Sequence, residues 1–127
     1  MSGTLATLLQ ALNEEVNILV VERLETTGLE SSASENNAGT GHAANCELNY
    51  TPSLGDGKVS ISKALAINHS FERSLEFWSS LTSQGILNPQ SFLHSLPHIS
   101  LVRGDSHIAF LKQRYEQLSE IPAFSGM

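Results

Sequence analysis

The sequence predicts an α/β fold, with one buried strand near the start of the chain and a mainly helical second half. Two observations lead to this fold class. Residues 18–21 form a continuous run of leucine and β-branched side chains, which is typical of a parallel strand buried on both faces. Residues 61–81 and 107–119 carry apolar side chains at three- and four-residue intervals, the period of an amphipathic helix.

Composition and charge narrow the class of protein. The chain has 127 residues, 40% hydrophobic and 16% charged, which indicates a globular protein. Its net charge of −6 argues against nonspecific nucleic-acid binding, which needs a basic surface. The single cysteine, Cys46, cannot form an internal disulfide, so we expect a reducing compartment. No apolar run approaches the roughly 18 residues of a transmembrane segment.

The first predicted helix covers residues 3–12, where four leucines recur at helical spacing. The predicted strand at 18–21 follows, and Glu22 stands at its carboxyl end. This order is that of a dinucleotide-binding βαβ unit, in which an acidic residue accepts hydrogen bonds from the adenosine ribose. The sequence therefore predicts part of a Rossmann-like domain.

The spacing of Glu22 supports this interpretation. The ribose-binding acid lies about 20 residues after the glycine-rich phosphate turn, and Glu22 lies 20 positions after Ser2. We therefore expect the chain to begin inside the phosphate loop of a βαβ unit that lacks its first strand, with Ser2 near the phosphates. A solvated Glu22 at a strand end, and Ser2 as a simple helix cap, are the alternatives.

Residues 36–44 (NNAGTGHAA) contain two glycines, three alanines and four hydrogen-bonding side chains. Small side chains allow a flat or charged ligand to approach the main chain closely. An ordinary polar loop is the alternative, because the same residue types dominate turns.

A glycine-containing turn is expected at residues 54–58. A long helix should follow, capped by Ser60 or Ser62 and ended by Gly85 at its C′ position. Its aromatic side chains are predicted to pack against a core rather than to form a ligand cage; these are Phe71, Phe77 and Trp78.

The last elements are shorter. Residues 97–102 read as a strand, on which His98 and Ser100 alternate and could face a substrate pocket. Ser106 is the expected cap of a final helix at 107–119, with one apolar face formed by Ile108, Leu111, Tyr115 and Leu118. A metal site at His94, His98 and His107 is not expected, since no carboxylate cluster accompanies these residues.

Three motifs closely resemble the malate:quinone oxidoreductases, in this order and spacing: VVERLE at 20–25, NNAGTGHAA at 36–44 and CELNYTP at 46–52. PHIS at 97–100 and FLKQRYEQL at 110–118 also resemble that family. The resemblance covers nearly the whole chain. It implies an FAD-dependent enzyme of the tricarboxylic acid cycle, which oxidises (S)-malate to oxaloacetate and passes electrons to membrane quinone. It also implies a cytoplasmic location, peripheral to the inner membrane, without a transmembrane segment.

The resemblance further implies that the chain is the amino-terminal quarter of a longer enzyme. Residues 1–57 would be a partial FAD-binding domain, and residues 58–127 a helical segment with the start of the substrate domain. Glu22 matches the ribose-binding acid, and Ser31 and Ser32 match small polar residues near the phosphates. Five residues match the segment beside the flavin: Asn37, Gly39, Thr40, Gly41 and His42.

Two positions depart from the family's usual pattern. Glu35 stands where tryptophan is common, and Asn45 stands where leucine is common. No catalytic residue is assigned, because none of the seven lysines and arginines lies in the block at 36–52. The chain alone is expected to be inactive and to bind FAD weakly or not at all. The alternatives are a related flavoprotein that acts on another 2-hydroxy or amino acid, and an inactive truncated product.

Overall fold

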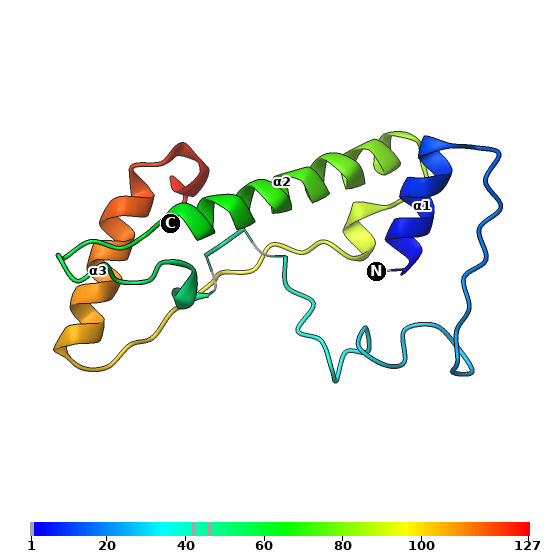
Figure 1. Cartoon of the computed structure of the whole chain (residues 1–127). Coiled ribbons are helices and arrows are strands. Elements are labelled where there is room, and N and C mark those ends of the chain that lie inside the picture. The colour runs from blue at the N-terminus through cyan, green and yellow to red at the C-terminus, as the bar shows by residue number, and fades with distance from the viewer. Residues whose placement is uncertain (1, 42, 46) are drawn as a thin grey trace. The chain divides into compact units, whose positions relative to one another are not determined.

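The structure is a computed structural model that describes residues 2–41, 43–45 and 47–127. The chain divides into two compact units, residues 1–40 (unit 1) and residues 41–127 (unit 2). Figure 1 labels α1 in unit 1, and α2 and α3 in unit 2. These units describe packing within this chain. The domain boundary between residues 57 and 58 rests on the family resemblance and stays a prediction.

Unit 1 begins with α1, Ser2–Leu12, which confirms the first predicted helix. Thr7 Oγ1 donates to the Gly3 carbonyl at 2.9 Å within the helix. None of the residues of α1 is buried, and Leu12 is 83% exposed. The apolar stripe that predicted the helix is therefore not covered by a core.

The strand predicted at residues 18–21 is wrong for this structure. These residues form no β-ladder, and Leu19 and Val21 are 86% and 81% exposed. A strand needs a neighbour that pairs its N–H and C=O groups and covers its faces, and no described segment does so here. The strand predicted at residues 97–102 fails for the same reason, with Leu101 95% exposed. The described chain is helical, and no sheet of a Rossmann-like domain forms in it.

The predicted turn at residues 54–58 is confirmed. Ser53 and Val59 form an isolated antiparallel bridge on either side of it. The Leu54 N–H donates to the Lys58 carbonyl at 2.9 Å and closes the loop. Gly55 and Gly57 have φ angles of 82° and 79°, a region that glycine adopts without steric cost.

Unit 2 continues with α2, Ser62–Ser83. Its N-cap is Ile61, which has no capping side-chain hydrogen bond, so the predicted serine cap is wrong. Its C-terminal end is as predicted, because Gly85 has φ 72°. The Gly85 and Ile86 N–H groups donate to the carbonyls of Thr82 and Leu81, both at 2.9 Å, which is the Schellman pattern.

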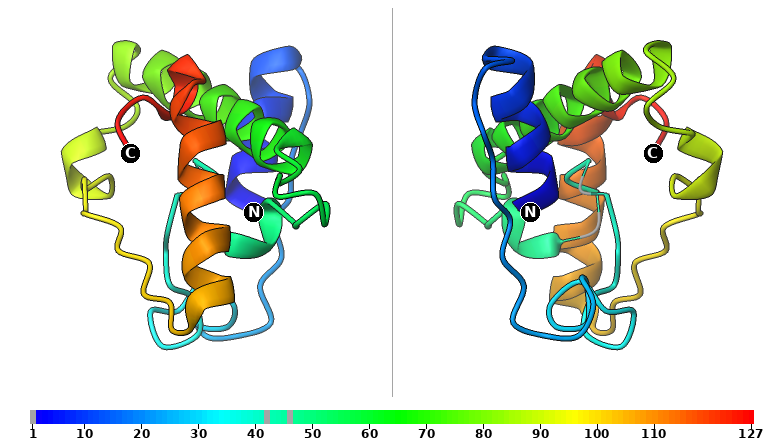
Figure 2. Two further views of the ribbon diagram at one scale, coloured as in Figure 1. Left: turned by 90° about the vertical axis from the view of Figure 1, so that its left-hand side faces the viewer. Right: turned by 90° about the vertical axis from the view of Figure 1, so that its right-hand side faces the viewer.

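Helix α3, Asp105–Ser119, contributes Leu118 to the same apolar cluster as Ala64 of α2. Figure 2 shows the two helices from two further sides. This apolar cluster consists of Ala44, Ala64, Leu118 and Phe124. The Gln117 side-chain amide joins α3 to the turn region, donating to the Val59 carbonyl at 2.9 Å and accepting from its N–H at 3.1 Å. Helix α3 begins after Gly104, at φ 90°, so the predicted Ser106 cap is wrong.

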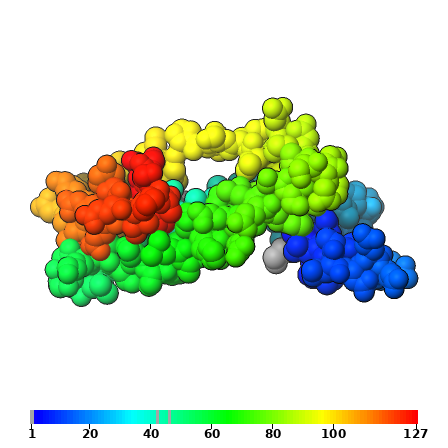
Figure 3. All heavy atoms as spheres, turned by 90° about the horizontal axis from the view of Figure 1, so that it is seen from above, coloured from blue at the N-terminus to red at the C-terminus, as the bar shows by residue number. Residues whose placement is uncertain are grey.

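The chain between α2 and α3 starts with a 3₁₀ turn, Pro89–Ser91, and the Asn88 side chain accepts from the Gln90 N–H at 3.1 Å. Trp78 of α2 contacts Phe92 edge to face, with ring centroids 5.4 Å apart. The predicted packing role of the aromatic stripe is therefore supported. Figure 3 shows the segment near residue 100 (yellow) standing away from α2.

Candidate functional site

Glu22, the predicted ribose-binding acid, is exposed in unit 1. Its Oε1 accepts hydrogen bonds from the N–H groups of the next two residues, Arg23 at 2.7 Å and Leu24 at 3.0 Å. The Arg23 side chain pairs with Glu30. The carboxylate thus turns back on its own main chain and organises a local bend.

Asn37 connects two other predicted site residues, Ser31 and Gly39. Its Nδ2 donates to the Ser31 carbonyl at 3.0 Å, and its Oδ1 accepts from the Gly39 N–H at 2.7 Å. Asn36 makes a parallel contact, donating from Nδ2 to the Glu30 carbonyl at 2.9 Å. The start of the glycine-rich segment is therefore folded onto the polar stretch before it, and we call this arrangement the Asn37 cluster.

The remaining predicted residues lie at different places. Ser2 is the first residue of α1, and Ser32 and Thr40 are exposed in unit 1. Gly41 belongs to unit 2, and a side chain there would place its Cβ 2.6 Å from the Phe71 ring of α2. His42 lies outside the described residues, as does Cys46.

The end of the glycine-rich segment is held tightly within unit 2. Ala44 is fully buried and has φ 69°, a left-handed conformation that costs a non-glycine residue about 1–2 kcal/mol. Arg114 of α3 donates from Nη2 to the carbonyls of Ala44 and Asn45, at 3.1 and 3.2 Å. Its Nε donates to Thr51 Oγ1 at 3.0 Å. Asn68 of α2 donates to the Ala43 carbonyl at 3.4 Å. We call these contacts the Arg114 clamp.

Sequence reasoning did not identify Arg114, which is only 2% exposed. Of the predicted apolar face of α3, Leu118 is buried, whereas Ile108 and Tyr115 are 42% and 52% exposed. One signal was present: Arg114 stands three residues after Leu111 and four before Leu118, within the apolar stripe. A cation at such a position must be paired or hydrogen-bonded when the helix packs.

A pocket of about 720 Å³ lies beside this clamp in unit 2. Its polar and charged lining comes from Asn45, His98, Ser100, Lys112, Arg114 and Tyr115. His98 Nε2 and Ser100 Oγ lie 3.2 Å apart. His98 and Ser100 thus line a pocket, as their alternation suggested, although they do so from an irregular segment.

Asn45 has an unusual environment within the pocket lining. Its Oδ1 atom is buried and accepts no hydrogen bond from any described residue. A buried amide oxygen without a donor costs free energy, because it has lost its water partners.

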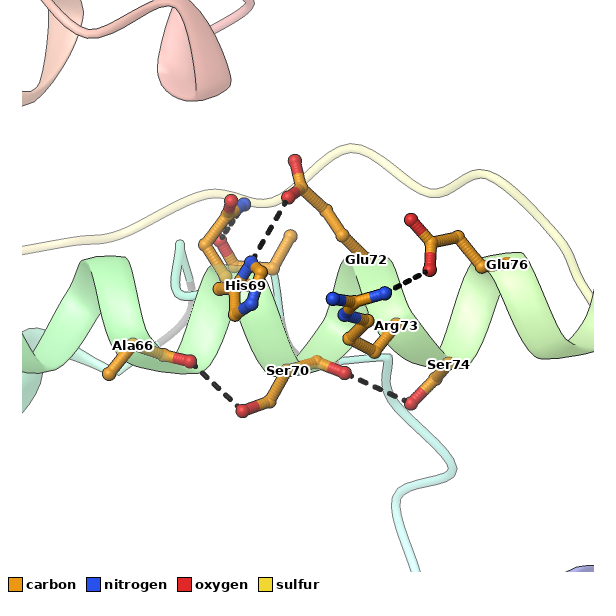
Figure 4. A network of polar contacts seen from close by, with 9 residues as sticks. Ala66, His69, Ser70, Glu72, Arg73, Ser74 and Glu76 are labelled. Carbon is orange, nitrogen blue, oxygen red and sulfur yellow. Dashed lines mark hydrogen bonds and ion pairs between the residues drawn. The ribbon is translucent and has the colours of Figure 1, made fainter. Parts of the chain in front are cut away.

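Two pairs of ionisable side chains form surface contacts on α2. On the exposed side of α2, His69 lies 4.0 Å from Glu72, and Arg73 lies 3.0 Å from Glu76 (Figure 4). No group of three or more His, Cys, Asp or Glu residues in the described ranges is arranged to hold a metal ion. In the same ranges, the helices are too short or too polar to cross a membrane.

The comparisons with known proteins assign the chain to a family. The family model described as malate:quinone oxidoreductase (Mqo) matches residues 1–127. The chain therefore belongs to the malate:quinone oxidoreductase family, as the motifs predicted.

Individual relatives agree with this assignment. A protein named "Probable malate:quinone oxidoreductase" from Prochlorococcus marinus (strain MIT 9313) is 66% identical over all 127 residues, which are 26% of its length. Proteins of the same name from Synechococcus sp. (strain CC9605) and Synechococcus sp. (strain RCC307) are 63% and 59% identical over the whole chain. The chain spans about a quarter of the length of the curated relatives it matches.

Proposed function

We propose that this chain is part of an FAD-dependent enzyme that oxidises (S)-malate to oxaloacetate and reduces a membrane quinone, a reaction of the tricarboxylic acid cycle. The observation that carries the proposal is the family match along all 127 residues, together with relatives named for this activity at up to 66% identity. A quinone is lipid-soluble, so the proposal includes a cytoplasmic protein peripheral to the inner membrane.

The residues of the Asn37 cluster fit a flavin nucleotide by their chemistry. Asn37 and Ser31, and Ser32 next to them in the sequence, offer amide and hydroxyl groups that are exposed and suited to phosphate and sugar oxygens. Gly39 has φ 63° and no atom within 4 Å of the place a side chain would take, which leaves its main chain open to a ligand. These features support FAD as the cofactor.

The proposed roles follow the family match. Glu22 and Ser2 would hold the adenosine and phosphate side, and Glu22 has lone pairs for ribose hydroxyls beyond the two N–H groups it already accepts. The flavin side would be held by Asn37, Gly39, Thr40, Gly41 and His42. When bound, the flavin supplies the redox chemistry by accepting the two electrons of the malate C2–H bond. The residues of this chain bind and orient it.

The test is to express the complete gene and to measure bound flavin and malate-dependent reduction of a quinone analogue. We expect a yellow protein that oxidises (S)-malate. Glu22→Gln should weaken FAD binding by about tenfold or more, because a hydrogen bond to a charged acceptor contributes roughly 1.5–3 kcal/mol. Glu25→Gln is the matched control, since Glu25 is an exposed acid three residues further on.

A colourless protein would contradict the cofactor, and a yellow protein without malate-dependent quinone reduction would contradict the substrates. Assays with other 2-hydroxy acids and with amino acids separate the proposed activity from that of a related flavoprotein. A complete gene product without any of these activities would favour the inactive alternative.

A further inference from the structure

Three consecutive carbonyl groups at the end of the glycine-rich segment accept hydrogen bonds from buried side chains of two helices. Asn68 of α2 donates to residue 43, and Arg114 of α3 donates to residues 44 and 45. The two donors are 7% and 2% exposed. They lie 25 to 70 positions away from their acceptors in the sequence. The main chain at this point is thus held by tertiary contacts.

The three acceptors around Arg114 are placed to match the donor positions of a guanidinium group. Its Nη2 faces two carbonyls, while its Nε donates to Thr51 Oγ1 at 3.0 Å. The Thr51 hydroxyl in turn donates to the Leu48 carbonyl at 3.1 Å. A guanidinium carries its N–H donors in a rigid planar fork, whereas a lysine ammonium presents three donors from one atom. Lysine would not reproduce these contacts together.

The residues before the clamp are also constrained. Gly41 lies three positions before Ala44, and a Cβ at Gly41 would lie 2.6 Å from the Phe71 ring. Gly41 and Ala43 therefore both lie against α2, and Ala44 has φ 69°.

We infer that Arg114 is a positioning residue, which fixes the main chain at residues 44 and 45 and thereby supports Gly41, the proposed flavin-facing residue that precedes them in unit 2. Arg114 acts on the ligand through the main chain that it holds. The flavin part of this inference rests on the proposed function, whereas the clamp itself rests on the contacts above.

The first experiment measures the clamp without the cofactor. Amide hydrogen exchange is recorded on the flavin-free protein from the complete gene, for the parent and for Arg114→Lys. Peptides covering residues 43–51 should exchange about tenfold faster in the variant, with α2 unchanged, because local opening becomes easier. Arg103→Lys is the matched control, the same substitution at an exposed site, and should change nothing.

Unchanged exchange at residues 43–51 in Arg114→Lys would overturn the inference. An equal rise throughout unit 2 would also overturn it, because Arg114 would then be a general core residue. If Arg114→Lys does not fold, Thr51→Val decides, since it removes the hydroxyl that accepts from Nε and donates to the Leu48 carbonyl. A rise in exchange at residues 43–45, away from Leu48, supports the clamp, and no rise there refutes it.

The second experiment measures the effect on the ligand. FAD is titrated into the flavin-free proteins, and visible circular dichroism reports the surroundings of the bound flavin. Arg114→Lys should weaken FAD binding by on the order of tenfold and alter this spectrum, because small displacements of ligand-facing groups are costly. Arg103→Lys should match the parent.

The outcomes separate the two proposals. A parent protein that takes up no flavin would refute the proposed function, and the exchange experiment would still decide the clamp. A parent that binds FAD with an affinity and spectrum unchanged by Arg114→Lys would refute the positioning role.

Discussion

At the scale of single residues, two arginines of unit 2 differ because of their surroundings. Arg73 is 68% exposed and pairs with Glu76, an arrangement that contributes about 1 kcal/mol at most. Arg114 is 2% exposed and donates to two carbonyls and a hydroxyl. Loss of its guanidinium would cost about 1–3 kcal/mol for each buried acceptor left without this donor. The buried arginine therefore decides local structure, and the exposed one does not.

Asn45→Leu should stabilise the protein. Asn45 Oδ1 is buried and accepts no hydrogen bond in the part of the chain that the structure describes. Leucine has a similar size and no polar atom, and the Asn45 main-chain carbonyl would still accept from Arg114. We expect the free energy of unfolding to rise by about 1–2 kcal/mol in a urea titration.

Asn49→Leu is the control, because Asn49 is exposed, and it should change the free energy by less than about 0.5 kcal/mol. A loss of stability in Asn45→Leu would show that the asparagine side chain makes a favourable contact.

At the scale of elements, α2 shows how a helix of 22 residues is ended without a side-chain cap. Its last carbonyls are satisfied by the N–H groups of Gly85 and Ile86. This pattern needs a left-handed residue at position 85, where the glycine has φ 72°. One glycine thus sets where the helix stops and where the chain turns toward Pro89.

Gly85→Ala should lower the free energy of unfolding by about 1 kcal/mol, because alanine is strained at this φ. No atom lies within 4 Å of a Cβ added at Gly85. The expected loss of stability therefore comes from backbone strain and not from steric crowding. Thermal and urea unfolding measure the change. Gly3 lies inside α1, and no atom would crowd a Cβ added there either. Gly3→Ala should instead raise the free energy of unfolding by about 0.5–1 kcal/mol, because alanine favours a helix over glycine. Equal effects of the two substitutions would contradict this explanation.

At the scale of the whole molecule, the two units differ in how they are stabilised. Residues 2–40 include no buried residue, whereas unit 2 has a core centred on Ala64, Leu118 and Phe124. The long-range hydrogen bonds of the Arg114 clamp also belong to unit 2. Local stability follows buried apolar contacts and paired main-chain groups, so unit 2 is expected to open less readily.

Limited digestion with thermolysin should show this difference. The first cuts in the 127-residue chain are expected within residues 13–40 and 95–103, which lie outside the helices and are largely exposed. Helix α2 should survive in the longest-lived fragments. Mass spectrometry of the time course identifies the cut sites. Early cleavage inside α2, at a rate equal to that within residues 13–40, would contradict the assignment of the core to unit 2.

The fold was predictable where local rules dominate. The helices, the turn at residues 54–58 and the stop at Gly85 all depend on residues a few positions apart. The strands predicted at residues 18–21 and 97–102 do not form, because an apolar run becomes a strand only when a neighbouring strand pairs with its main chain. In the candidate site, the family motifs located the glycine-rich segment, and the structure joined Asn37 to Ser31 and Gly39. The roles of the predicted cofactor residues stay predictions.

The sequence by itself determined the family of this protein and the positions of its helices, because motifs and helical periodicity are properties of neighbouring residues. Only the tertiary structure decided that Arg114 lies inside and that its side chain holds residues 44 and 45. The physical reason is that a buried cation takes whichever acceptors packing brings within reach. Those acceptors stand 63 to 70 positions away along the chain.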